Sequence, residues 1–243
     1  MYNDIESGSF ASSSQYQLMG ISTRRVRNEF VKKVYSILSI QLLLTTLIAS
    51  PFVLNKQAAQ IWTYNNQWVV WLSLAISFTI MLTFACCPFL MRQFPTNYFL
   101  LFLFTVAEGV CVGIISSVYT TDSVLMALGT VTVVFFGLTL FALTTDLDFT
   151  KTWPYLFAIT MVMIVAGFVL MFFPSHIGHM IYAGIGALLF SVYLIFDTQM
   201  IIGGKRDYEF SIDDYVPAAI ALYIDIVQLF IYFLQLFGEQ DRR

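Results

Sequence analysis

Three carboxylates lie within strongly apolar stretches of this sequence. Asp225 interrupts "LYIDIVQLF", Asp197 interrupts "LIFDTQM", and Glu108 lies in "FTVAEGVCVG". An ionised carboxylate at the centre of a bilayer costs about 2.5–3.5 kcal/mol on insertion scales. Each of these residues therefore needs a compensating role. Acidic side chains in such positions share protons, bind cations or form hydrogen bonds to neighbouring helices.

Asp197 and Asp225 occupy comparable depths in consecutive apolar runs. At about 1.5 Å per helical residue, Asp225 lies about 15 Å from the start of its run and Asp197 about 9 Å from the end of its own. Adjacent antiparallel helices can bring these residues together, and two buried carboxyls in contact cannot both ionise cheaply. We therefore expect the pair to share a proton and to act as a proton sensor.

Two alternatives remain for the aspartate pair. A Ca²⁺ ion could bind at Asp197 and Asp225 in place of the proton, because hard cations prefer carboxylate oxygens. The two residues could instead only bridge helices through hydrogen bonds, with Gln199 and Gln228 helping. Arg92 ends the second apolar run on the same side of the membrane as the pair, so we expect it to be their counter-ion and gate.

The composition indicates an integral membrane protein with an all-α fold. Hydrophobic residues make up 58% of the chain and charged residues only 11%, whereas about a quarter of residues are charged in soluble domains. Seven runs have the length of about 20 residues that a spanning helix needs. The runs are 33–54, 68–91, 97–118, 124–144, 153–173, 178–202 and 215–237. We expect residues 1–28 to be a disordered cytosolic tail and residues 29–243 to form one seven-helix domain.

The last run has one polar or small face. Its members recur at intervals of three or four residues, which places them on one helical stripe, and they are Ala218, Ala221, Asp225, Gln228, Tyr232 and Gln235. Such a stripe faces protein or water in preference to lipid. We expect Gln228 on this stripe, and Glu108 in the third run, to line an ion pathway.

The basic residues indicate the orientation. If the N-terminus is cytosolic, nine of the twelve basic residues lie on the cytosolic side, as the positive-inside rule requires. The other side collects Lys56, Arg242 and Arg243. The two closing arginines leave one alternative open, in which the seventh run is re-entrant and both termini are cytosolic.

Several functional classes lack the residues they need. The last run has no lysine for a retinal Schiff base, and His176 and His179 are the only histidines available for a metal site. No "HExxH" or paired "GxGD" motif is present. The sequence therefore gives no candidate catalytic machinery, and we expect neither an enzyme nor a resident cofactor. Nothing in the composition suggests a nucleic-acid partner.

Three segments carry a resemblance to a known family. They are "FVKKVYSILSIQLLLTT" in the first run, "ALLFSVYLIFDTQMI" in the sixth and "YVPAAIALYIDIVQLFIYFLQLFG" in the seventh. The sequence from about Arg25 to Gly238 resembles the transmembrane Bax inhibitor motif family, also called lifeguard, and is most similar to its Golgi anti-apoptotic protein branch. Bacterial members carry an acidic residue in span two that is absent here, and we expect Glu108 to substitute for it.

The resemblance implies a seven-helix bundle with the last helix central. It also implies a pH-sensitive Ca²⁺ leak in Golgi or endoplasmic reticulum membranes that suppresses cell death, with Asp197 and Asp225 as the proton sensor and Arg92 as its partner. Two other functions stay open. One is a non-conducting regulator that binds cell-death proteins or Ca²⁺-release channels, and the other is a proton-coupled transporter. The sequence leaves the oligomeric state undetermined.

Overall fold

The observed architecture is an all-α bundle whose long helices are apolar enough to cross a membrane. The computed structural model describes residues 3–204 and 206–239, and this part of the chain contains seven candidate spans and no strand. The elements are α1 (Asn3–Leu54), α2 (Lys56–Asn65), α3 (Gln67–Cys86), α4 (Pro88–Arg92), α5 (Thr96–Ser116), α6 (Thr121–Thr144), η1 (Phe149–Thr152), α7 (Trp153–Phe172), α8 (His176–Ile202) and α9 (Tyr215–Phe237). The predicted multi-span α fold is confirmed.

The second apolar run differs from its predicted form. The sequence suggests one helix over 68–91, whereas α3 ends at Cys86 and the short helix α4 begins at Pro88. Proline has no backbone N–H to continue the hydrogen-bond ladder of α3, so the chain restarts there with proline in the first turn, where no such bond is needed. This break places Arg92 at the end of a separate short helix.

Side-chain caps define the starts of two spans. The Thr120 side chain accepts a hydrogen bond from the backbone N–H of Ser123 at the start of α6, and Ser175 accepts one from Gly178 at the start of α8. Such caps satisfy N–H groups that have no partner within the helix. The far end of α8 is closed by Gly203, whose φ of 64° lies in the left-handed region that favours glycine.

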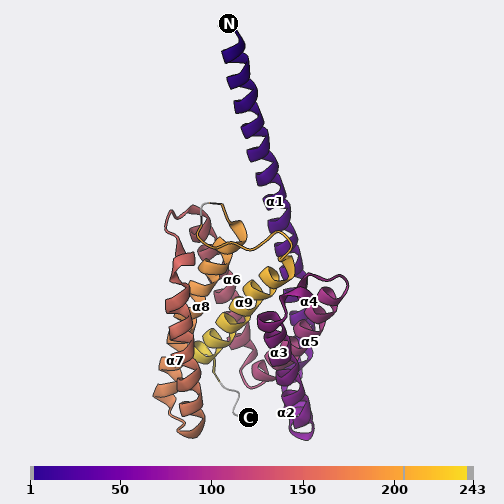
Figure 1. Cartoon of the computed structure of the whole chain (residues 1–243). Helices are drawn as coiled ribbons and strands as arrows, with labels where there is room; N and C mark the ends of the chain where they lie inside the picture. Colours follow the sequence, from indigo (N-terminus) through magenta and orange to yellow (C-terminus); the bar gives the residue numbers. More distant parts are fainter. Residues whose placement is uncertain (1–2, 205, 240–243) are drawn as a thin grey trace.

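Helix α9 is the centre of the bundle, as expected. It packs against α1, α4, α5, α6 and α8, and Figure 1 shows it running obliquely between α7 and α8 on one side and α3 and α5 on the other. Of its most apolar 18-residue window, 56% is buried, against 11% for the peripheral span that ends with α7. A helix enclosed by other helices can keep polar side chains away from lipid, which is the condition that Asp225 requires.

A small residue brings α8 and α9 close together. Gly186 of α8 faces the ring of Tyr232 of α9, and a Cβ atom added at this glycine would overlap that ring. Ala183 and Ala218 are fully buried in the same core. Small residues at such contacts allow the backbones of spanning helices to approach each other. This approach positions the polar side chains farther along the same two helices.

The first helix extends far beyond the bundle. Figure 1 shows the N-terminal half of α1 projecting away from the other helices. Residues 3–28 are helical here, so the disordered form of residues 1–28 stays a prediction about the tail, and Met1 and Tyr2 lie outside the described residues. A polar helix without tertiary packing is marginal in water.

Arg27 joins the start of the first span to the connection between α8 and α9. Its guanidinium donates hydrogen bonds to the carbonyl oxygens of Met200 at 2.6 Å, Phe210 at 2.7 Å and Ile202 at 3.1 Å. The start of the first span and this connection therefore lie at the same end of the bundle. The predicted orientation requires this arrangement, although Lys205, Arg242 and Arg243, which entered that prediction, lie outside the described residues.

Candidate functional site

The two aspartates of the last spans meet inside the bundle. Asp197 comes from α8 and Asp225 from α9, and their side chains lie in hydrogen-bonding contact with each other. Both residues are buried, with exposed fractions of 8% and 3%. The sequence therefore correctly identifies which carboxylates come together, because the two helices are consecutive and antiparallel.

The surroundings of the pair offer little compensation for negative charge. Among the described residues, each carboxyl contacts the other, Tyr193 lies close enough to interact electrostatically with both, and no cation lies beside them. The Oδ2 atom of Asp225 has no hydrogen-bond partner among the described residues. Two unpaired carboxylates in an apolar interior are very costly. The geometry therefore favours a protonated carboxyl or a bound cation at this position.

Arg92 does not reach the pair. It pairs instead with Asp214 at the start of α9, with Nε donating to Oδ1 at 2.6 Å and a terminal guanidinium nitrogen to Oδ2 at 2.9 Å. The hydrogen bonds that Arg92 donates to this carboxylate raise the pKa of Arg92 above its usual value. The predicted counter-ion role at Asp197 and Asp225 is therefore wrong in this conformation. An arginine at the membrane surface pairs there at lower cost than it enters the hydrocarbon.

Asp214 is the site residue that the sequence reasoning missed. It flanks α9 on the side of the membrane where Arg92 lies, and a bidentate arginine–carboxylate pair fixes geometry better than a single contact does. The pair joins α4 to the start of the central helix. The available signal was the acidic doublet Asp213 and Asp214 directly before the last apolar run.

Glu108 belongs to a different polar cluster, on the opposite side of α9. It is half-buried on α5 near Ser77 of α3 and Tyr223 of α9. Tyr223 and Asp225 are two residues apart, which at 3.6 residues per turn separates their directions by about 200°. The three carboxylates therefore lie at two sites. Asp197 and Asp225 meet between α8 and α9, whereas Glu108, on α5, lies on the side of α9 that packs against α1 and α5.

Hydrogen bonds organise part of the Glu108 cluster. Gln41 donates from Nε2 to the Thr105 hydroxyl at 3.1 Å, and the hydroxyls of Thr45 and Tyr223 are 2.7 Å apart. The Ser77 hydroxyl lies beside the Glu108 carboxyl, and Oε1 of Gln41 is buried without a hydrogen-bond partner among the described residues. An unpaired buried acceptor favours a hydrated cluster over a dry apolar contact.

Gln228 lies three residues after Asp225 and is half-buried. This spacing places both side chains on the same face of α9. Gln228 is therefore positioned to continue the polar stripe, and its role in an ion pathway stays a prediction.

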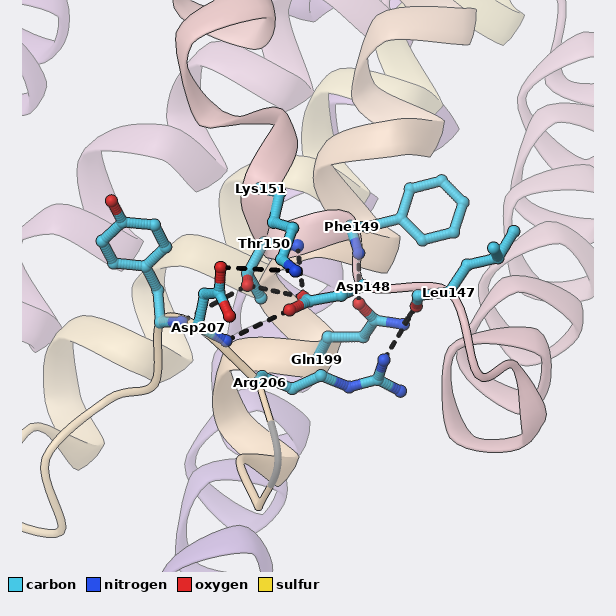
Figure 2. A network of polar contacts seen from close by, with 9 residues as sticks. Leu147, Asp148, Phe149, Thr150, Lys151, Gln199, Arg206 and Asp207 are labelled. Atoms are coloured by element: carbon cyan, nitrogen blue, oxygen red, sulfur yellow. Dashed lines mark hydrogen bonds and ion pairs between the residues drawn. The ribbon is translucent and has the colours of Figure 1, made fainter.

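Gln199 serves a different purpose from the expected one. Its Oε1 accepts a hydrogen bond from the backbone N–H of Phe149 at 2.8 Å, and its Nε2 donates to the carbonyl oxygen of Leu147 at 2.9 Å. Arg206 donates to the same Leu147 carbonyl at 2.8 Å and to that of Thr145 at 2.9 Å. Figure 2 shows the contacts of Gln199 with Phe149 and Leu147, and that of Arg206 with Leu147, converging on the chain between α6 and α7. Gln199 thus fixes this connection and does not bridge the aspartates.

Asp148 completes this surface network (Figure 2). Its carboxylate accepts hydrogen bonds from the backbone and hydroxyl of Thr150 at 3.0 and 2.6 Å and from the backbone of Asp207 at 3.1 Å, and Lys151 lies 3.5 Å from the Asp207 carboxylate. Burial alone would raise the pKa of Asp148. The hydrogen bonds from Thr150 and Asp207 and the charge of Lys151 outweigh it and hold the pKa below its usual value.

The described residues contain no group of three or more histidine, cysteine or acidic side chains that could hold a metal ion. The aspartate pair supplies carboxylates from two residues, whereas Ca²⁺ takes six to eight oxygen ligands in a stable site. This donor set suits transient contact with a passing cation better than a permanent metal centre.

Comparisons with known proteins agree with this architecture. The family model described as "Inhibitor of apoptosis-promoting Bax1" matches residues 27–242. Protein lifeguard 3 of Mus musculus is 35% identical over 99% of this chain and 77% of its own length, and the Homo sapiens protein lifeguard 3 is 36% identical over 90% and 71%. Protein lifeguard 4 of Mus musculus is 36% identical over 90% of this chain and 88% of its own. This multi-span membrane protein therefore belongs to the Bax inhibitor, or lifeguard, family.

Proposed function

We propose that the protein is a pH-sensitive Ca²⁺ leak channel of Golgi or endoplasmic reticulum membranes, gated by the Asp197–Asp225 pair. The observation that carries the proposal is the contact of two buried carboxyls without a cationic partner among the described residues. Such a pair changes charge when one proton leaves. It is also located between the central helix and α8, where a change in charge acts directly on helix packing.

Gating follows from the electrostatics of the pair. While the carboxyls share a proton, α8 and α9 stay together. When the proton leaves, two unit charges about 4 Å apart repel by about 4 kcal/mol at an effective dielectric constant of about 20. This repulsion favours separation of the two helices, entry of water and transient binding of Ca²⁺ to the ionised oxygens. Flux therefore rises as pH rises through the titration of the pair.

The surface pair of Arg92 and Asp214 supports a second part of this mechanism. It ties α4 to the start of α9, so it restrains the helix that carries Asp225. In the proposed channel this ion pair holds the closed arrangement, and its separation accompanies movement of α9. Gln228, on the Asp225 face, contacts the passing ion.

The cellular role is proposed from the family. Release of Ca²⁺ from the lumen lowers the amount available for cell-death signalling, so the leak inhibits apoptosis, in agreement with the description of the matching family model. The N-terminus is proposed to be cytosolic, because most basic residues then lie on the cytosolic side. Candidate protein partners are cell-death regulators and Ca²⁺-release channels.

The test is Ca²⁺ flux into liposomes that contain the purified protein and a trapped Ca²⁺ dye. The proposal predicts flux that increases from pH 5 to pH 8, with protein-free liposomes as the blank and an ionophore to define full equilibration. If thermal unfolding shows that the protein is folded and there is still no flux at any pH, the channel is contradicted and a non-conducting regulator is favoured.

A further inference from the structure

A cavity of about 350 Å³ lies between α1, α5, α6 and α9. Helix α1 packs on α5 and α9, and α6 packs on α8 and α9, so the cavity separates α1 from α6. Its volume is within the range of small-molecule sites. The lining residues Ile226, Val227 and Phe230 form its α9 wall, and none of them shares the direction of Asp225. The cavity is therefore separate from the carboxylate pair.

The cavity is long and follows the helices. Its α1 wall runs from Leu42 to Leu54, which is about 18 Å at 1.5 Å per residue, and its α6 wall runs from Thr121 to Val131, about 15 Å. These lengths are about half of the 30 Å hydrocarbon core of a bilayer. The cavity thus extends from one membrane surface, where α1 ends and α6 begins, to the middle of the membrane.

Hydroxyl groups line the cavity at both ends. Toward the middle of the membrane the α6 wall is formed by Leu128 and Val131, and the hydroxyls of Thr45 and Thr46 on the α1 wall already bond to the Tyr223 hydroxyl and to the Leu42 carbonyl. The surface end carries the hydroxyls of Ser50, Ser116 and Thr121. Among the described residues that line the cavity, none is charged. Ser116 is 1% exposed, and its hydroxyl has no hydrogen-bond partner among the described residues. A buried hydroxyl in this state lacks a partner that a bound molecule can supply.

The mouth of the cavity faces the bilayer. Leu125 is 61% exposed and Leu128 39%, and both lie on a membrane-spanning helix. At this depth the surrounding medium is lipid, so the molecule that enters must be apolar along most of its length. We propose that the cavity binds one acyl chain of a bilayer phospholipid, with the chain directed toward the membrane centre and its ester carbonyl accepting a hydrogen bond from Ser116.

The choice of an acyl chain over a sterol rests on shape. The walls come from four helices, and α9 crosses the bundle obliquely (Figure 1). A flexible chain can follow such a surface, whereas a rigid ring system cannot. The length of the cavity also matches one leaflet, which is the length that an acyl chain spans.

The test uses the full-length protein in detergent micelles, with a phosphatidylcholine that carries a photoactivatable group on one acyl chain. Cross-linked peptides are identified by mass spectrometry across a range of lipid concentrations. The proposal predicts saturable cross-linking within 42–54 and 121–131 that excess unlabelled phosphatidylcholine displaces. Leu128→Trp fills the cavity and should reduce this labelling at least fivefold. Leu140→Trp is the matched control, since Leu140 is 63% exposed on the same helix and does not line the cavity.

A second variant tests the polar end without filling the cavity. Ser116→Ala should weaken the saturable component by about fivefold, which is the loss expected for one neutral hydrogen bond. Three results would overturn the proposal: labelling that does not saturate, equal labelling in Leu128→Trp and Leu140→Trp, or displacement by cholesterol but not by phosphatidylcholine. The first two would indicate ordinary annular lipid, and the third a sterol site. Thermal unfolding checks that each variant is folded, and Ser116→Ala remains informative if Leu128→Trp is not.

Discussion

Asp225→Asn changes the chemistry of the carboxyl pair while nearly preserving its shape. The amide is close in size to the carboxyl and still forms hydrogen bonds, but it does not titrate. In the wild type, ionisation of one aspartate opposes ionisation of the other, because oxygen atoms in a direct hydrogen bond are only about 2.5–3.0 Å apart. Asp197 in the variant meets no such repulsion, so it loses its proton at lower pH.

The repulsion sets the size of the expected change. Two unit charges about 4 Å apart interact by about 4 kcal/mol at an effective dielectric constant of about 20, and about 1.36 kcal/mol corresponds to one pH unit. The midpoint of Asp197 ionisation should therefore move down by about 1 to 3 units. Because the variant never carries the two charges whose repulsion separates the helices, Ca²⁺ flux in Asp225→Asn should stay low and nearly flat between pH 5 and 8.

The assay is Ca²⁺ flux into dye-loaded liposomes at half-unit pH steps. Asp122→Asn is the matched control, because Asp122 is an exposed carboxylate in the first turn of α6, and it should keep the wild-type profile. Thermal unfolding establishes that both variants are folded. A titration of Asp225→Asn that superimposes on wild type from pH 5 to 8 would refute the sensor and leave the pair with a purely structural role.

Four further predictions concern the surroundings of the pair. Glu108→Gln should leave the midpoint of flux against pH within about half a unit of wild type, because Glu108 lies on the other side of α9. A larger shift would show that Glu108 and the aspartate pair are electrostatically coupled. Arg92→Ala should raise Ca²⁺ flux at all pH values without moving the midpoint of flux against pH. Asp214→Asn should do the same, and the double variant should show no further increase, because both changes break the same ion pair. Gly186→Ala should destabilise the protein by about 1–3 kcal/mol in thermal unfolding through overlap with Tyr232, whereas Gly184→Ala, with open space around it, should not. Asp148→Asn should lower the unfolding temperature equally at pH 5 and pH 8. A different effect at these two pH values would contradict the lowered pKa of the Asp148 carboxylate.

The prediction for Asp148 follows from the sign of its pKa shift. The hydrogen-bonded carboxylate has a folded pKa below its usual value of 3.8. Its stabilisation is therefore complete above the unfolded pKa of about 3.9 and is lost only as pH falls through the folded value. The Asp148 carboxylate in Figure 2 stays ionised from pH 5 to 8, so it does not supply the pH response proposed for the channel.

Much of the fold could be predicted because a bilayer imposes simple rules on a sequence. Apolar length alone located the seven spans, and the polar stripe of the last run indicated a helix surrounded by protein. The break at Pro88 was not predicted, and neither was its consequence for Arg92. Whether a proline bends a helix or starts a new one depends on the packing around it.

The candidate site was predictable in its centre and not at its edges. Asp197 and Asp225 lie on consecutive helices, so adjacency follows from topology. The partners of Arg92 and Gln199 depend instead on how the connections fold at the membrane surface, and no periodic pattern specifies that. Glu108 shows a third limit: the sequence does not tell which face of α9 it lies beside, and the different directions of Tyr223 and Asp225 on α9 separate it from the aspartates.

The most direct test of the shared proton is infrared spectroscopy of the protein in liposomes, which detects the C=O stretch of protonated carboxyl groups. A shared proton predicts a protonated-carboxyl band that is present at pH 5 and decreases toward pH 8, and whose pH-dependent part disappears in the double variant Asp197→Asn, Asp225→Asn. Glu108→Gln should leave that part in place. A pH-dependent band that persists unchanged in the double variant, or its absence from the wild type, would contradict a shared proton between Asp197 and Asp225.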